Sequence, residues 1–192
     1  LTTLITCYNG NFKKIINYLK QKHPDIEIIL YNKKNKDFGV PVKNVGVDAY
    51  DKLHFVINNY DDLSDIVFFS TDNMLSSTKK IKKIEYIVNN INILKENSGF
   101  LTGHIFPMPK NEIKFELPVY NNIKNIRASI IPYDKWFNTF IDENIDVSNT
   151  YICKKSTFAV TKDLILSNSK EFYIRLLEQV ENYSVRGHGS ET

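Results

Sequence analysis

The sequence predicts an α/β fold: a mixed, mostly parallel sheet flanked by helices, followed by a more irregular α+β second half. One observation is a strand–helix–strand pattern with short joints within residues 1–36. Such a βαβ unit pairs its strands in parallel through a right-handed crossover. Another is a buried-type apolar run at residues 66–70 that ends in a polar segment. After residue 97 the segments shorten and prolines appear.

The βαβ unit is defined by the spacing of its apolar residues. Residues 1–6 and 26–30 are apolar stretches of strand length. Between them, apolar side chains at positions 12, 15, 16 and 19 follow the spacing of a helix packed on one face. We therefore expect a helix over residues 12–21, ended by His23 and Pro24.

Two further helices flank the apolar run at 66–70. After a loop over residues 37–47, the pattern predicts a helix at 48–59 with Asp48 as its N-cap. A second helix is expected at 77–95, where apolar residues form one stripe. Together with the βαβ unit, these elements make residues 1–97 resemble a nucleotide-binding layer.

The second half is expected to mix short strands and helices. A capping box is indicated by Asn168 with Glu171 three residues later. The single Trp136 could stack on a sugar, but a single Trp beside Phe137 is by default expected to pack in the core. The predicted strands lie at 99–106, 113–117 and 151–160, and the predicted helices at 132–141 and 168–182.

Composition limits the classes of protein that are worth considering. The chain has 192 residues, 42% hydrophobic and 24% charged, which describes one globular domain with a substantial core. Its net charge of +3 is small and evenly spread, so nucleic acid is not expected as the main partner. No run of about 18 apolar residues is present, so no transmembrane segment is predicted.

Location and completeness are also predicted from the sequence. Cys7 and Cys153 are far apart and are expected as buried thiols in a reducing compartment. With no signal peptide visible, this favours a cytoplasmic location. The chain begins without Met and ends in a glycine-rich segment, so we expect a fragment of a longer protein with further domains.

Polar residues follow the three predicted parallel strands at their carboxyl ends, over 6–9, 31–33 and 70–73. Open parallel sheets bind ligands outside this edge. Asp72 could there ligate a hard cation such as Mg²⁺ or Mn²⁺, with phosphate oxygens and water completing the shell. The alternative is an ordinary turn, because Asp and Asn are common turn residues.

Several other side chains admit two interpretations. Tyr8 and Tyr31 end neighbouring strands, where each could stack on a nucleobase or cap the core. His188 lies in the glycine-rich segment 186–191, which could close over a ligand or fray as a terminus. Four lysines lie near the start of the helix at 77–95: Lys79, Lys80, Lys82 and Lys83. Positive charges are unfavourable at a helix N-terminus, so these lysines could indicate a bound anion nearby. The alternative is that they form a solvated face.

Common enzyme signatures are absent from the sequence. There is no Gly-x-Gly-x-x-Gly segment, no P-loop, no Cys–His zinc spacing and no Gly-x-Ser-x-Gly elbow. The sequence therefore contains no motif that would assign the protein to one of those enzyme classes.

Some segments are familiar from a known family. The residues Ile5-Thr-Cys-Tyr-Asn9 resemble the first strand and turn of GT-A glycosyltransferases. Residues 44–61, 136–160 and 171–177 resemble glycosyltransferase-like proteins, including the amino-terminal domain of a chlorella virus enzyme linked to capsid protein glycosylation. The resemblance implies a single GT-A-like domain with a nucleotide-binding half (1–97) and an acceptor half (98–192). For a viral protein, the location would be the host cell cytoplasm.

The resemblance also implies ligands and site residues. GT-A enzymes hold a divalent cation (Mn²⁺ or Mg²⁺) on an Asp-x-Asp motif, and the matching segment here is Ser70-Thr71-Asp72. Only the final acid is present, so Asp72 inherits the metal role and Ser70 at most a hydrogen bond to the donor. Contacts with a UDP-sugar donor are further implied for Thr6, Tyr8, Asn9, Tyr31 and Lys33.

The implied reaction moves a hexose or deoxyhexose from the UDP-sugar to an acceptor hydroxyl on a glycan or glycoprotein. Inverting transfer needs a base, for which we select Glu191, with His188 as an extra metal ligand. Retaining transfer stays open. Two alternatives are a sugar nucleotidyltransferase, which should carry a glycine-rich loop after the first strand, and a non-catalytic carbohydrate- or protein-binding module.

Overall fold

The computed structural model describes residues 1–7, 12–34, 37–46, 48–94, 96, 99–103, 105–107, 130, 133–153 and 157–183. The strands are β1 (Thr2–Cys7), β2 (Glu27–Asn32), β3 (Val40–Pro41), β4 (Ile66–Thr71), β5 (Phe100–Thr102), β6 (Ile105–Pro107), β7 (Tyr151–Cys153) and β8 (Phe158–Thr161). The helices are α1 (Phe12–Lys22), α2 (Ala49–Asn59), α3 (Thr78–Asn90), α5 (Tyr133–Phe140), α6 (Lys162–Leu166) and α7 (Lys170–Tyr183).

The main sheet has the strand order β3-β2-β1-β4-β8-β5. Strands β3, β2, β1 and β4 are parallel, whereas β8 is antiparallel to both β4 and β5. A separate antiparallel pair joins β6 to β7. The predicted α/β class and the mostly parallel sheet are confirmed.

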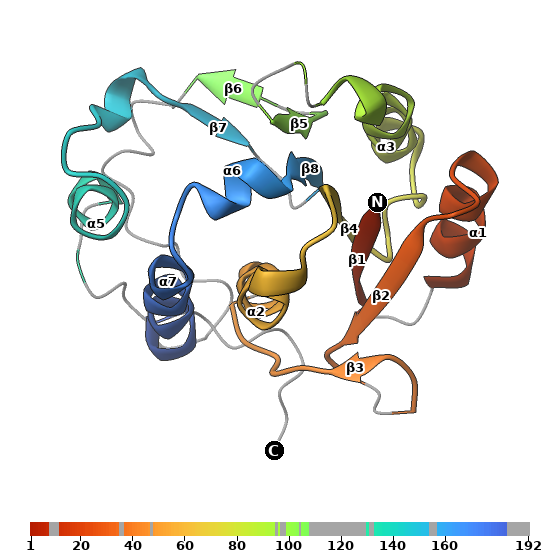
Figure 1. Ribbon diagram of the computed structural model, residues 1–192, viewed down its shortest axis with the longest axis horizontal. Coiled ribbons are helices and arrows are strands. Elements are labelled where there is room, and N and C mark those ends of the chain that lie inside the picture. Colours follow the sequence, from red (N-terminus) through yellow and green to blue (C-terminus); the bar gives the residue numbers. More distant parts are fainter. Residues whose placement is uncertain are drawn as a thin grey trace.

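Helices cover both faces of this sheet (Figure 1). Successive residues of a strand face opposite sides, so Leu4 and Ile5 of β1 enter different apolar clusters. Ile5 packs with Ile15 of α1 and Ile84 of α3. Leu4 lies in the cluster that contains Phe55 of α2 and Ile165 of α6. The sheet is therefore the middle layer of three.

The order of the strands creates a switch point. From β1 the chain moves to β2 and β3 on one side, and it then returns to place β4 on the other side of β1. The helices that follow β1 and β4 consequently cover the same face, while α2 covers the opposite one. In open α/β sheets such a reversal leaves a crevice outside the carboxyl ends of the two adjacent strands.

Two strand predictions were wrong in extent. The predicted strand at 99–106 is divided into β5 and β6, and that at 151–160 into β7 and β8, with the members of each pair in different sheets. Gly103 lies at the first break, where a Cβ would be 3.0 Å from the Lys83 Cβ of α3. The predicted strand at 113–117 lies outside the described residues.

The predicted helices agree with the structure apart from their ends. The helix expected to reach residue 95 ends at Asn90 and continues as a 3₁₀ turn over Ile91–Ile93. The two-residue β3 and the five-residue α6 were not predicted. Both are too short to show a periodic pattern, and α6 begins where the Thr161 hydroxyl accepts the Leu164 N–H.

The predicted caps were only partly correct. Asp48 occupies the N-cap position of α2, but its side chain accepts no helix N–H and pairs with Lys52 instead. The capping box on Asn168 was wrong. Ser169 Oγ accepts the Phe172 N–H at 3.3 Å, which makes Ser169 the cap of α7.

Gly99→Ala is expected to destabilise the protein by more than about 1 kcal/mol. Gly99 has a φ of +73°, and a Cβ there would lie 2.5 Å from Thr161 Oγ1. Chemical denaturation measures the change. Glu96→Ala, at an exposed position of the same connection, is the control, and equal midpoints for the two variants would contradict the prediction.

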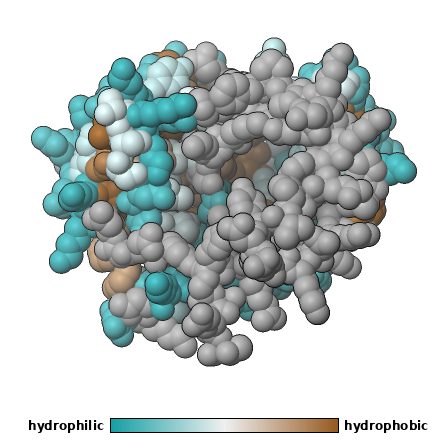
Figure 2. Space-filling view, turned by 180° about the vertical axis from the view of Figure 1, so that it is seen from behind, coloured by the Kyte–Doolittle hydropathy of each residue, from teal (hydrophilic) through white to brown (hydrophobic). Residues whose placement is uncertain are grey.

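The described surface is mostly hydrophilic in the view from behind, with small apolar areas between polar side chains (Figure 2). Within the part of the chain that the structure describes, no helix has the length and apolar character needed to cross a membrane.

Candidate functional site

The carboxyl ends of β1, β2 and β4 lie side by side, as predicted for parallel neighbours. The Lys33 N–H donates to the Cys7 carbonyl at 3.2 Å. On the other side of β1, the Asp72 N–H donates to the Thr6 carbonyl at 3.0 Å. These bonds extend the strand ladders by one residue and fix the backbones of Lys33, Thr6 and Asp72 at one edge of the sheet.

Asp72 follows β4 directly and is buried, with 6% of its surface exposed. Its charge reaches the thiol of Cys7, whose pKa is raised to about 12 by burial first, then by Asp72 and Asp51. Cys7 therefore stays a neutral thiol at physiological pH, so it is unsuited to act as a nucleophile. The acid predicted for this edge lies at the switch point between β1 and β4.

A buried ion pair that the sequence analysis missed lies behind the strand ends. Lys33 Nζ is 3.1 Å from Asp51 Oδ1, and the two side chains are 2% and 0% exposed. Lys33 Nζ also donates to the Val45 carbonyl at 3.1 Å. Asp51 lies four residues before Phe55 on the same buried face of α2.

Burial dominates the electrostatics of this pair. It raises the pKa of Asp51 to about 6, against the opposing effects of Lys33 and the Thr6 hydroxyl. Burial likewise lowers the pKa of Lys33, which Asp51 opposes. The Lys33 ammonium and the Thr6 hydroxyl therefore stabilise the charged carboxylate only in part, because burial outweighs them.

This pKa predicts how stability depends on pH. Because the pKa of Asp51 is raised from 3.8 to about 6, the folded state keeps a proton that the unfolded state has lost between these values. Stability from this group should therefore be present at pH 4 and decline as pH rises through 6, by at most about 3 kcal/mol. Urea unfolding measures the free energy of unfolding of the wild type minus that of Asp51→Asn. This quantity should fall as pH rises from 4 to 6, and a rise over the same range would contradict the prediction.

The other predicted donor contacts differ in accessibility. Tyr31 is 4% exposed, its hydroxyl lies 3.0 Å from His54 Nδ1, and its ring belongs to the core on the α2 face. This favours capping of the core over stacking on a nucleobase. Ser70 is buried within β4, whereas the half-buried Thr71 donates to Asn73 Oδ1 at 3.1 Å.

The lysines of α3 have two different roles. Lys80 Nζ donates to Asn73 Oδ1 at 3.1 Å and to Ser76 Oγ at 3.1 Å, which braces the turn that follows Asp72. Lys79 and Lys82 are exposed, as expected of a solvated face.

Several predicted residues lie outside the described part of the chain. They are Tyr8, Asn9, His188 and Glu191. Their proposed contacts, metal ligation and base function remain predictions. Cys153 falls in β7, but its side chain is not described, whereas Cys7 is buried as expected.

The residues at this edge are compatible with a hard cation that arrives with its own phosphate ligands. No group of three His, Cys, Asp or Glu side chains gathers within the described ranges. Magnesium and manganese ions need only one or two carboxylates when phosphate oxygens and water complete the shell. Asp72 provides one such carboxylate at the switch point, next to the end of β1.

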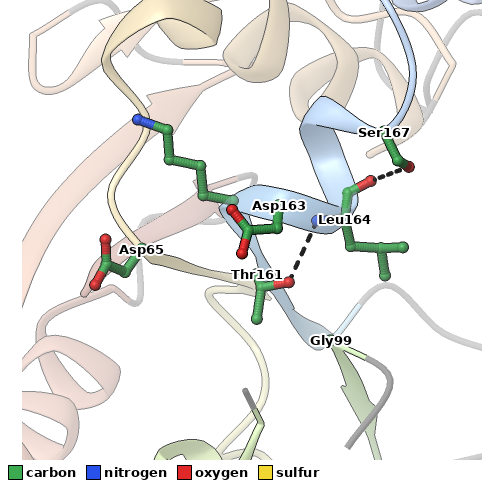
Figure 3. A pocket seen from close by; sticks show the side chains of 7 residues that line it. Asp65, Gly99, Thr161, Asp163, Leu164 and Ser167 are labelled. Carbon is green, nitrogen blue, oxygen red and sulfur yellow. Dashed lines mark hydrogen bonds between the residues drawn. The ribbon is translucent and has the colours of Figure 1, made fainter. Parts of the chain in front are cut away.

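Two cavities with described walls lie elsewhere. One of about 430 Å³ is at the opposite edge of the sheet, where Asp65 precedes β4 and Asp163 belongs to α6 (Figure 3). The other, of about 440 Å³, is apolar and lies beside α2. We place the candidate site at the carboxyl edge because the switch point and the buried charges coincide there.

The sequence also matches a family model. Residues 12–190 match the family described as "Protein of unknown function (DUF3431)". The chain belongs to this family. Lys33, Asp51 and Asp72 fall inside the DUF3431 match, whereas Thr6 precedes it. No curated protein sequence matches the chain significantly.

Proposed function

We propose that this DUF3431 chain is a metal-assisted glycosyltransferase domain with a GT-A-like fold, binding a UDP-sugar at the carboxyl edge of its sheet. The observation that carries the proposal is the position of Asp72, buried at the end of β4 and bonded through its N–H to the end of β1. Ligands of open α/β sheets bind at such switch points. The single antiparallel strand β8 within the sheet suits the mixed sheet expected of this fold.

Charge balance at this edge supports a cation as part of the site. Lys33 directly follows β2 and its side chain is buried, and Asp51 already balances its charge. Its Nζ is further occupied by the Val45 carbonyl. A diphosphate bound here would therefore need another positive charge, and Lys80 beside it already donates to Asn73 and Ser76. Asp72 would hold a divalent ion, Mn²⁺ or Mg²⁺, which when bound neutralises charge on the departing diphosphate.

The proposed reaction transfers a hexose or deoxyhexose to a hydroxyl of a glycan or glycoprotein. The acceptor oxygen forms a bond to the anomeric carbon while the bond from that carbon to the diphosphate oxygen breaks, releasing UDP. In the inverting form, Glu191 takes the proton of the acceptor hydroxyl. His188 is proposed as a further metal ligand, and Thr6 and Ser70 as the polar groups nearest the donor.

Calorimetric titration tests the proposal on the wild-type chain. UDP and UDP-glucose should bind once per chain in Mn²⁺ and at least about tenfold more weakly in EDTA. Absence of nucleotide binding in both conditions would reject the proposal and favour a non-catalytic binding module. Release of pyrophosphate from UTP and a sugar phosphate would instead identify a sugar nucleotidyltransferase.

A further inference from the structure

An apolar cavity of about 440 Å³ lies between α2, the face of β4 and β8, and helices α6 and α7. Phe69 of β4 and Phe158 of β8 form its floor, with ring centroids 5.1 Å apart. Leu164 lines the cavity and is 39% exposed, which places it where the cavity opens to solvent. The cavity is thus a pocket with aromatic and aliphatic walls.

Two of the polar side chains that line this pocket, Lys52 and Tyr173, already have partners. Lys52 lines it, but its Nζ pairs with the Asp48 carboxylate and lies 5.7 Å from the centre of the Phe158 ring. The Tyr173 hydroxyl donates to the Ile165 carbonyl at 2.7 Å. A charged ligand would have to disrupt the Lys52–Asp48 pair, whereas a neutral apolar ligand would leave these bonds intact.

The pocket opens to solvent beside Leu164, so a ligand can reach it from outside. Its volume of about 440 Å³ lies within the range of roughly 300–1,000 Å³ that is typical of small-molecule pockets, which are mostly apolar. Covering its apolar walls with an apolar ligand removes that surface from water, which is favourable.

We propose that this pocket binds a neutral hydrocarbon chain, such as the acyl or isoprenoid part of a larger molecule. Phe69, Phe158, Val56 and Leu53 would contact the chain, and it would enter beside Leu164. None of the described residues that line the pocket is among those proposed for the donor site. The proposal therefore holds whether or not that edge binds a nucleotide.

The neutral fluorophore N-phenyl-1-naphthylamine tests this assignment. It should bind the wild-type chain saturably, with one molecule per chain and increased fluorescence. Decanol should displace it at least tenfold more effectively than decanoate, which has the same chain length and a charge. Absence of saturable binding to the folded chain, or displacement by decanoate at least as effective as by decanol, would overturn the proposal.

Variants locate the binding. Leu53→Trp should fill the pocket, because Leu53 lines it and is half-buried. We expect at least tenfold weaker probe binding with an unchanged or higher Tm. Ala49→Phe, also on the pocket wall, provides a second filling variant if Leu53→Trp does not fold. Tyr86→Trp, at a 52% exposed position on α3, is the control. Equal probe affinity in the control and in a folded filling variant would place binding elsewhere and reject the proposal.

Discussion

Asp51→Ala is expected to destabilise the folded protein by about 3–5 kcal/mol at neutral pH. The substitution leaves Lys33, whose side chain is 2% exposed, without its ionic partner. The Val45 carbonyl accepts one hydrogen bond from Lys33 but cannot balance its charge. Part of the loss should be recovered at high pH, where a buried, unpaired lysine releases its proton. Denaturant unfolding across pH measures both effects.

A double substitution separates the energetic contribution of the Lys33–Asp51 ion pair from the cost of leaving one of its charges unpaired. Because burial penalises both charges, replacing them together by Lys33→Met and Asp51→Leu should recover most of the stability lost in Asp51→Ala. The pair Lys43–Glu181, 66% and 31% exposed, is the matched control, and Glu181→Ala should leave the unfolding midpoint nearly unchanged. Similar midpoints for Asp51→Ala and Glu181→Ala would show that the buried pair is not energetically special.

Asp72→Asn is expected to lower the affinity for UDP in Mn²⁺ by about 10- to 100-fold. Asparagine keeps the size of the side chain and the backbone N–H that bonds to Thr6, but it removes the charge that attracts a hard cation. In EDTA the wild type and the variant should bind UDP with similar affinity. Calorimetry with Mn²⁺ and with EDTA gives the UDP affinity of the wild type and of the variant in both conditions.

Asp65→Asn is the control for this variant. Asp65 is exposed and precedes the same strand β4 at its opposite, amino-terminal end. Its substitution should leave UDP binding unchanged in Mn²⁺. If Asp65→Asn and Asp72→Asn weaken binding equally, the effect is one of net charge, and the assignment of a metal ligand to Asp72 is wrong.

Elements with long, regular patterns could be predicted from the sequence. The apolar spacing of α1 and α3 and the β-branched runs of β1 and β4 are properties of neighbouring residues, so they are visible without tertiary information. The breaks between β5 and β6 and between β7 and β8 are not local. They follow from pairing with partners in different sheets.

The candidate site likewise has parts that could be predicted from the sequence and parts that could not. That the ends of β1, β2 and β4 share an edge followed from the βαβ pattern, because parallel strands align their carboxyl ends. Asp51 could not be assigned in this way. The apolar positions of α2 predict a buried face of Ala49, Leu53, Val56 and Ile57. Val56 is buried as predicted, but packing also buries Tyr50, Asp51 and Phe55.

The sequence by itself therefore determined the α/β class, the main helices and the acid that ends β4. Tertiary structure alone decided which face of α2 is buried, that Lys33 has a partner, and where the apolar pocket lies. The physical reason is the range of the interactions. Periodicity arises within one element, whereas the burial of a charge or the walls of a cavity depend on segments far apart in the chain.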